Sequence, residues 1–177
     1  ICVTGDLGSA FTGLQVLERE RRLFEGGAGV QPELSEYEYI IGRQLKPDLR
    51  TDLLRKIRDE GVETSAMTIV REGLASELLG LCSENKMGCR IYYDKLPVDQ
   101  ETHRCAAEMN SDPVVAALNG GDDFEFLFFA PIGMVKAISK IKDIRMIGYL
   151  TDPAEGYYLV TPEDEMVELR AQGWQKQ

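Results

Sequence analysis

Residues 124–129 (Phe-Glu-Phe-Leu-Phe-Phe) form the strongest strand signal in the chain, and two glycines, Gly120 and Gly121, lead into them. Further strand-like segments lie at residues 1–5, 66–70, 89–93, 145–149, 157–160 and 165–169. Helix-forming patterns separate most of these segments. Strands that alternate with helices, without an internal repeat or a low-complexity linker, predict one layered domain over residues 1–177.

The helix patterns give three specific expectations. In the first helix, after residue 8, the apolar stripe is expected to be Phe11, Leu14 and Leu17. Pro47 is expected to open a later helix at its first turn. A further helix is expected around residues 132–142.

Composition narrows the class of function. The 177 residues are 44% hydrophobic and 28% charged, as in a globular protein. Thirty acidic residues against twenty Lys and Arg give a net charge of −10. This balance argues against binding of nucleic acid or of an anionic membrane. Four cysteines without a CxxC pair, and the single His103, argue against a zinc site and favour reduced thiols in a cytoplasmic protein.

Two glycine-containing turns are candidate ligand sites. Residues 4–8 (Thr-Gly-Asp-Leu-Gly) join a strand to a helix, where backbone N–H groups can meet phosphate. Their spacing matches neither GxGxxG nor a P-loop, so a structural turn is the favoured interpretation. Residues 120–125 (Gly-Gly-Asp-Asp-Phe-Glu) place two carboxylates before a buried strand. They can hold Mg²⁺ or an ammonium group, or simply form an acidic turn.

Two further features remain open in the same way. Arg71 and Glu72 precede Gly73 at the start of a helix, a place suited to an anion or a metal–phosphate complex, although composition alone favours simple helix capping. Trp174, near the end of the chain, either packs on the domain or covers a ligand ring.

Taken in order, the motifs resemble the C-terminal half of thiamine-monophosphate kinase, a family of the aminoimidazole ribonucleotide synthase superfamily. The matching segments are residues 3–8, 13–14, 45–47 with Arg50, 73–78, 96–97, 117–125, 147–148 and 173–174. They run nearly from end to end of the chain. Their order and spacing make the resemblance more specific than any single motif.

The resemblance implies an α+β fold, a layered α/β/α domain with a mixed sheet. It also implies that residues 1–177 are a single C-terminal domain, and that the family's N-terminal domain for ATP binding and homodimerisation is absent. A buried strand beginning at Ile1 agrees with a piece of a longer protein. The implied reaction transfers a phosphoryl group from ATP to thiamine monophosphate with Mg²⁺, giving thiamine diphosphate in the cytoplasm.

The resemblance also implies roles for residues. Asp122 stands where the first acid of the family's Gly-Gly-Glu-Asp-Tyr-Glu motif contacts the substrate, and Trp174 matches the closing aromatic near the thiamine. The family motif Met-Asp-x-Ser-Asp-Gly-Leu supplies two Mg²⁺ aspartates and an ATP-contacting serine. Aligned on the Gly-Leu pair, those places hold Ile69, Arg71 and Glu72.

This last motif departs from the family. Ile69 cannot bind a metal ion, Arg71 can bind phosphate, and Glu72 alone keeps an acid for the metal. No residue is assigned a catalytic role, and the chain by itself is expected to be inactive. The alternative is a non-catalytic homologue that binds nucleotide or thiamine phosphate with a degenerate metal site.

Overall fold

The computed structural model describes residues 1–28 and 34–172 of the chain. The helices are α1 (Ser9–Leu23), α2 (Glu38–Leu45), α3 (Thr51–Asp59), α4 (Leu74–Glu84), α5 (Gln100–Glu108), α6 (Pro113–Asn119) and α7 (Val135–Ile138). The strands are β1 (Cys2–Thr4), β2 (Ala66–Val70), β3 (Gly88–Tyr92), β4 (Glu125–Phe129), β5 (Ile144–Met146), β6 (Gly148–Thr151), β7 (Tyr157–Val160) and β8 (Met166–Glu168).

The described strands form two four-stranded sheets. The first, in the order β2-β4-β1-β5, is antiparallel throughout, and Cys2 on β1 lies between Phe128 on β4 and Met146 on β5. The second, in the order β6-β3-β7-β8, is mixed, because β3 and β7 run parallel. The expected α+β fold with a mixed sheet is therefore confirmed, with the parallel pairing confined to the second sheet.

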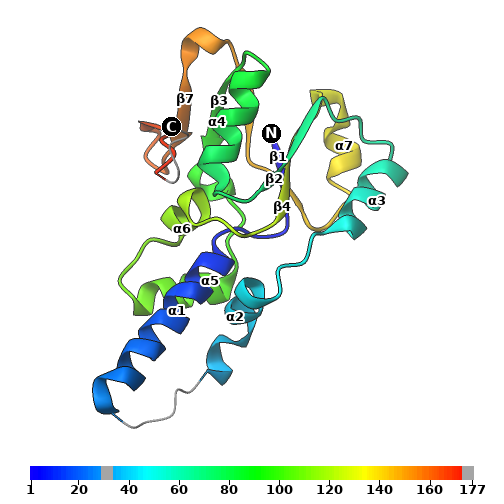
Figure 1. Cartoon of the computed structure of the whole chain (residues 1–177). Coiled ribbons are helices and arrows are strands. Elements are labelled where there is room, and N and C mark those ends of the chain that lie inside the picture. The colour runs from blue at the N-terminus through cyan, green and yellow to red at the C-terminus, as the bar shows by residue number, and fades with distance from the viewer. Residues whose placement is uncertain (29–33, 173–177) are drawn as a thin grey trace.

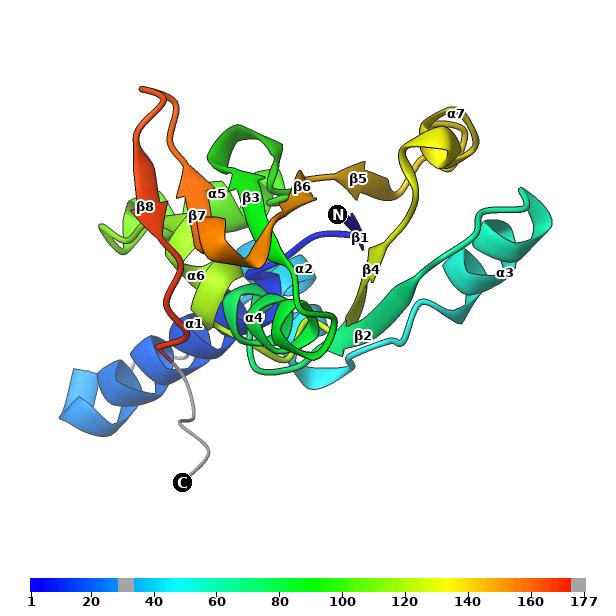
Figure 2. The same ribbon diagram turned by 90° about the horizontal axis from the view of Figure 1, so that it is seen from above.

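Helices cover both faces of the first sheet (Figures 1 and 2). On one face Phe128 packs with Leu53 of α3 and Ile138 of α7. On the other face Leu127 packs with α4 and with residues of the second sheet, such as Ile91. Strand β4 alternates between these two cores, which is why all five of its residues are buried and its strand signal is strong.

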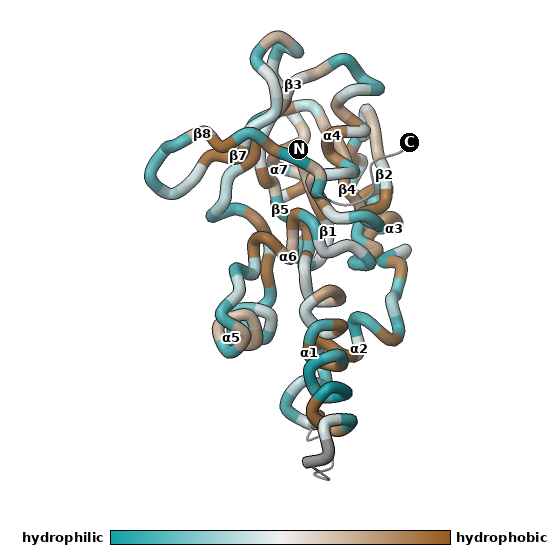
Figure 3. The backbone as a smooth tube through the Cα atoms, turned by 60° about the vertical axis from the view of Figure 1, so that its left-hand side comes forward, coloured by the Kyte–Doolittle hydropathy of each residue, from teal (hydrophilic) through white to brown (hydrophobic). Residues whose placement is uncertain are grey.

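Helices α1 and α2 extend away from the sheets as an arm, and α1 alternates hydrophilic and hydrophobic positions (Figures 1 and 3). The expected stripe on α1 is wrong, because Leu14 is exposed and Phe11 and Leu17 are only partly buried. The buried face consists of small residues with Val16. A Cβ at Gly13 would lie 2.2 Å from the Ile40 carbonyl oxygen, so the two helices approach too closely for large side chains.

Three other differences concern element boundaries. Pro47 lies in the connection before α3, which begins only at Thr51. The helix expected over 132–142 is a 3₁₀ turn followed by the short α7. The strand expected over 145–149 divides at Ile147 into β5 and β6, one in each sheet, because Ile147 bonds to both Ile1 and Tyr92 through its backbone.

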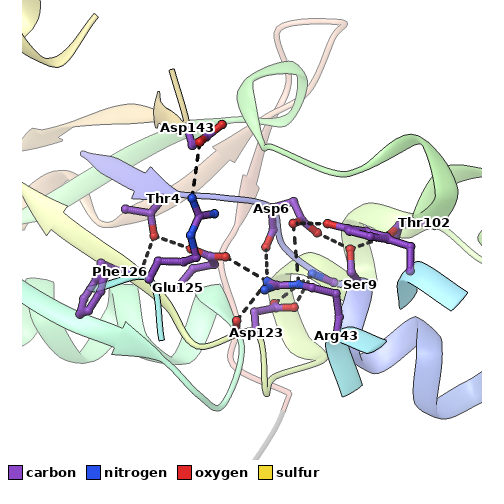
Figure 4. A network of polar contacts seen from close by, with 12 residues as sticks. Thr4, Asp6, Ser9, Arg43, Thr102, Asp123, Glu125, Phe126 and Asp143 are labelled. Atoms are coloured by element: carbon purple, nitrogen blue, oxygen red, sulfur yellow. Dashed lines mark hydrogen bonds and ion pairs between the residues drawn. The ribbon is translucent and has the colours of Figure 1, made fainter. Parts of the chain in front are cut away.

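Arg43, on α2, joins segments that are far apart in the sequence (Figure 4). Its Nη2 donates to the Glu125 carboxylate at 3.0 Å and to the carbonyl oxygens of Asp6 and Asp123 at 3.2 and 3.1 Å. Its Nε lies 3.8 Å from a carboxylate oxygen of Asp6. We call these four residues the ionic junction. It holds α2 against the turn after β1 and the turn before β4.

The Glu125 end of the ionic junction has no contact with solvent. Thr4 donates its hydroxyl to Glu125 at 2.5 Å and accepts the Phe126 N–H at 2.8 Å, so the carboxylate is held from β1 as well. A Cβ at Gly5 would lie 2.1 Å from the same carboxylate, and Gly5 has a φ of +55°. Glycine is therefore required at this turn both by space and by conformation.

Asp123, which is 1% exposed, fixes the start of α1. Both of its carboxylate oxygens accept the Gly8 N–H, at 3.0 and 2.9 Å. Burial is the largest influence on this group and raises the pKa of Asp123 to about 7, against the opposing effects of the Gly8 bond and of Arg43. The proton on this carboxyl is therefore lost near neutral pH.

Replacing Arg43 tests the junction. We expect Arg43→Met to lower the free energy of unfolding by about 3–5 kcal/mol, because it leaves the buried Glu125 without its positive partner. The measurement is urea denaturation. Arg55→Met, at an exposed position of α3, is the matched control, with an expected change within about 0.5 kcal/mol. Equal effects of the two substitutions would contradict the role given to Arg43.

The raised pKa of Asp123 predicts a pH dependence. The folded state keeps this proton to about pH 7, whereas an unfolded aspartate loses it near pH 4, so the free energy of unfolding falls as pH rises between these values. The fall attributable to this group is up to about 4 kcal/mol. Asp123→Asn should remove that part of the slope in denaturation curves taken from pH 4 to 8. Asp48→Asn, an exposed site with the same change of charge, should leave the slope unchanged.

Candidate functional site

The candidate site lies at β2, which forms one edge of the first sheet. A hollow of 590 Å³ opens there beside the last residues of β2 and the start of α4. It is lined by Met67, Thr68, Ile69, Arg71, Glu72, Glu77 and Phe126. A smaller hollow of 380 Å³ continues along α4 and adds further polar positions, including Ser76 and Glu84. We call these two adjoining spaces the edge hollow.

Two of the residues expected at a phosphate or metal site, Arg71 and Glu72, therefore lie in one concave place. Both occupy the turn between β2 and α4. Glu77 reaches back from α4, and its Oε1 accepts the N–H groups of Arg71 and Glu72, each at 3.3 Å. Its carboxylate thus satisfies two backbone donors of the turn. The turn is held in shape by the first residues of its own helix.

Asp122 lies beside this turn. Its N–H donates to the Arg71 carbonyl oxygen at 2.8 Å, and the Phe124 N–H donates to Val70 at 2.9 Å. The pairing of β2 with β4 thus continues into the turn that bears Asp122. The Asp122 side chain is exposed and does not line the hollow itself. The structure brings Arg71, Glu72 and Asp122 together, while Trp174 lies outside the described residues.

Glycine makes this close approach possible. A Cβ at Gly121 would lie 2.6 Å from the Arg71 carbonyl oxygen, and a Cβ at Gly73 would lie 2.6 Å from that of Leu118. Both glycines have a positive φ, and Asp122 itself adopts a φ of +59°. Such a backbone is uncommon outside glycine and carries strain, which the surrounding contacts must offset. Gly121 therefore lets the two turns meet, and Gly73 lets the start of α4 approach the end of α6.

The three acids within residues 120–125 have different environments. Asp122 faces solvent, whereas Asp123 and Glu125 point into the ionic junction and hold the turn from behind. Burial is the largest influence on Glu125 and raises its pKa, while the Thr4 hydrogen bond and Arg43 lower it. Sequence reasoning treated Asp122 and Asp123 as a pair of possible ligands. It missed Arg43, whose partners become visible only when α2 is folded against the two turns.

The charges of the edge hollow suit a ligand with two ends. Arg71 supplies a guanidinium, which binds phosphate through several N–H groups. Glu72, Glu77 and Glu84 supply negative charge along α4. A molecule with an anionic group at one end and a cationic group at the other would meet both kinds of side chain.

The same residues do not make a magnesium site by themselves. Ile69 contributes no oxygen ligand, and the Glu77 carboxylate is bonded to backbone N–H groups. In residues 1–28 and 34–172, no group of three or more His, Cys, Asp or Glu side chains is placed to hold a metal ion. Glu72 as a metal ligand therefore stays a prediction.

Among the described residues, none of the helices has the length and apolar character that a membrane span requires.

No protein-family model matches the chain. Among curated proteins, the thiamine-monophosphate kinase of Methanopyrus kandleri is 30% identical over 132 residues, which cover 75% of this chain and 40% of that protein. The thiamine-monophosphate kinase of Pyrococcus horikoshii is 29% identical over 179 residues, which cover 99% of this chain and 49% of that protein. The chain thus spans about half the length of the relatives it matches.

Solved structures give the same result for the fold. AaThiL complexed with AMPPCP and TMP aligns with a TM-score of 0.79 at 22% identity, over 99% of this chain and 50% of that one. The hydrogenase maturation protein HypE of E. coli aligns with a TM-score of 0.68 at 18% identity. The alignment covers 99% of this chain and 50% of the HypE chain. The resemblance that the motifs indicated is thereby confirmed: this chain is similar in sequence to thiamine-monophosphate kinases and shares its fold with them and with HypE.

Proposed function

We propose that this chain is the thiamine-phosphate-binding part of a kinase of the thiamine-monophosphate kinase type. The observation that carries the proposal is the similarity to proteins of that name over 99% of the chain, at 27–29% identity. We also propose that residues 1–177 form one domain and that a second domain supplies most of the ATP site and the homodimer contact. The related AaThiL structure holds AMPPCP and TMP, which supports nucleotide and a thiamine phosphate as ligands here.

The geometry of the edge hollow supports thiamine monophosphate as the ligand. This molecule carries a phosphate and a permanently cationic thiazolium ring. In this proposal Arg71, which lines the hollow, would receive the phosphate, and glutamates along α4 would face the ring. Asp122 lies at the turn beside Arg71, within the same part of the surface. An opposite-charge match of this kind gives orientation as well as attraction.

A second candidate function is favoured by one observation. Ile69 and Arg71 line the hollow where the resemblance expects a metal aspartate and a serine. An apolar side chain offers no ligand to a metal ion, and a guanidinium binds phosphate without binding a metal ion, so neither helps to hold the Mg²⁺ that phosphoryl transfer uses. The alternative is therefore a protein that binds thiamine phosphate or nucleotide and does not turn it over. Binding and turnover must be measured separately.

The first experiment measures binding. We expect the chain to bind thiamine monophosphate in isothermal titration calorimetry, and we expect Arg71→Ala to weaken binding by about tenfold or more, because it removes a charge-assisted phosphate contact. Arg55→Ala, an exposed arginine on α3, is the control and should bind as the parent does. Absence of binding, or equal loss in both variants, would remove the edge hollow from the proposal.

The second experiment measures turnover with ATP, Mg²⁺ and thiamine monophosphate, reading thiamine diphosphate by chromatography. The chain alone should form none, because phosphoryl transfer needs the metal-bound nucleotide that the proposed second domain positions. The informative version fuses the chain to the part of the Pyrococcus horikoshii kinase that it does not match.

In that fusion, the triple change Ile69→Asp, Arg71→Ser and Glu72→Asp should raise turnover by an order of magnitude or more if the site is a weakened kinase site, because it restores metal carboxylates. The conservative change Ile69→Val is the control and should leave turnover unchanged. Binding by the parent chain with no gain in the triple variant would favour the binding protein over the kinase.

A further inference from the structure

A second concave region lies at the opposite edge of the first sheet, along β5. A groove of 940 Å³ separates this strand from the segment that follows β3. One wall contains Leu96, Pro97 and Val98, and the other contains Lys142, Ile144 and Arg145. We call it the basic groove. It shares no lining residue with the edge hollow.

The charge of the basic groove differs from that of the whole chain. Lys95, Lys142 and Arg145 line it against one acid, Asp94, which leaves an excess of two positive charges in a chain of net charge −10. Among the described residues, Lys142 and Arg145 form no ion pair, whereas Arg50 nearby is paired with Asp52 and Asp143. Within the described part of the chain these two cations therefore carry no ion pair on this wall, and the adjoining hollow of 350 Å³, which they also line, brings three acids near them: Asp6, Asp99 and Asp143.

Both cations are carried by fixed backbone. Arg145 lies on β5 in register with Val3 of β1, and its neighbour Ile144 is buried. Lys142 follows Ile141, which is buried, and precedes Asp143. The carbonyl oxygen of Asp143 accepts the Gly5 N–H at 2.8 Å. The two side chains therefore start from defined points, although their ends are exposed.

The opposite wall is also fixed, and three of its residues, 96–98, are apolar. The Pro97 carbonyl oxygen accepts the Leu7 N–H at 2.8 Å, which ties this segment to the turn after β1. Leu96 is buried, Pro97 and Val98 are partly buried, and Met146 adds exposed apolar surface from β5. A concave space that combines apolar surface with a few charged groups is the usual form of a small-molecule site, and the volume of this groove lies within the usual range.

We propose that the basic groove binds a phosphate-bearing small molecule with an apolar ring. The phosphate lies between Lys142 and Arg145, and the ring lies against Pro97 and Val98. Two nearby cations give the charge-assisted hydrogen bonds that phosphate favours, and the apolar wall gains from covering the ring. The site is separate from the proposed function and does not depend on it.

Phenyl phosphate is a suitable probe, because it joins one ring to one phosphate. It is titrated into the chain while backbone amide signals are followed by NMR. We expect saturable shifts confined to residues 94–98 and 141–146. Inorganic phosphate and phenol are the two other arms, and each should bind at least about tenfold more weakly, since each offers only half of the contact.

Two double variants then distinguish binding in the basic groove from non-specific attraction of phosphate to surface cations. The double change Lys142→Ala and Arg145→Ala should weaken phenyl phosphate binding by about tenfold or more. The matched double change Lys136→Ala and Arg55→Ala removes two exposed cations outside the groove and should have no effect. Absence of saturable shifts, equal loss in the two double variants, or shifts that map to the edge hollow would overturn the proposal. Equal binding of inorganic phosphate would overturn the part played by the apolar wall.

Discussion

The contact of Arg43 with Glu125 is the interaction on which the arrangement of the turns depends. A carboxylate with no solvent contact is stable only when a positive partner and hydrogen bonds replace water, and Arg43 and Thr4 supply them. The same guanidinium contacts the carbonyl oxygens of Asp6 and Asp123. One side chain therefore aligns the turn after β1 with the turn before β4.

That alignment positions the surface where ligands are proposed to bind. Asp123 and Glu125 face inward and hold their turn, so Asp122 is left on the outside beside Arg71. The turn after β1 is held by Asp123 through Gly8 and by the carbonyl oxygens of Asp143 and Pro97 through Gly5 and Leu7. The edge hollow and the basic groove thus lie on two edges of one sheet and share a rigid centre.

The sequence predicted most elements of this fold because strand and helix periodicities are local properties. It predicted β2 and β4 within a residue and the start of α4 within a residue, and it placed Arg71 and Glu72 in the turn that the structure forms. It could not predict the division at Ile147, since a run of five strand-like residues, 145–149, carries no sign that its two ends pair with different sheets. Which segments meet is decided by the tertiary arrangement.

The buried face of α1 and the ionic junction were not predicted from the sequence, for a similar reason. Large apolar residues were expected inward, but the close contact at Gly13 leaves room only for small ones. Arg43 looks like an ordinary surface charge on α2, and its partners lie in two distant motifs. Only the acids of residues 120–125 carried a signal. The sequence showed that they were unusual and did not show that two of them face inward.

The central place of β1 bears on how the molecule is made. This strand pairs with β4 and β5, so its residue Cys2 meets Phe128 and Met146. During translation β1 leaves the ribosome long before β4 and β5 have been synthesised. Until then its backbone and its apolar side chains stay unpaired. Contacts of such large sequence separation slow folding and prolong exposure to aggregation. We therefore expect the first sheet to form late and slowly during folding. We also expect chaperones to assist the chain until β1 is paired.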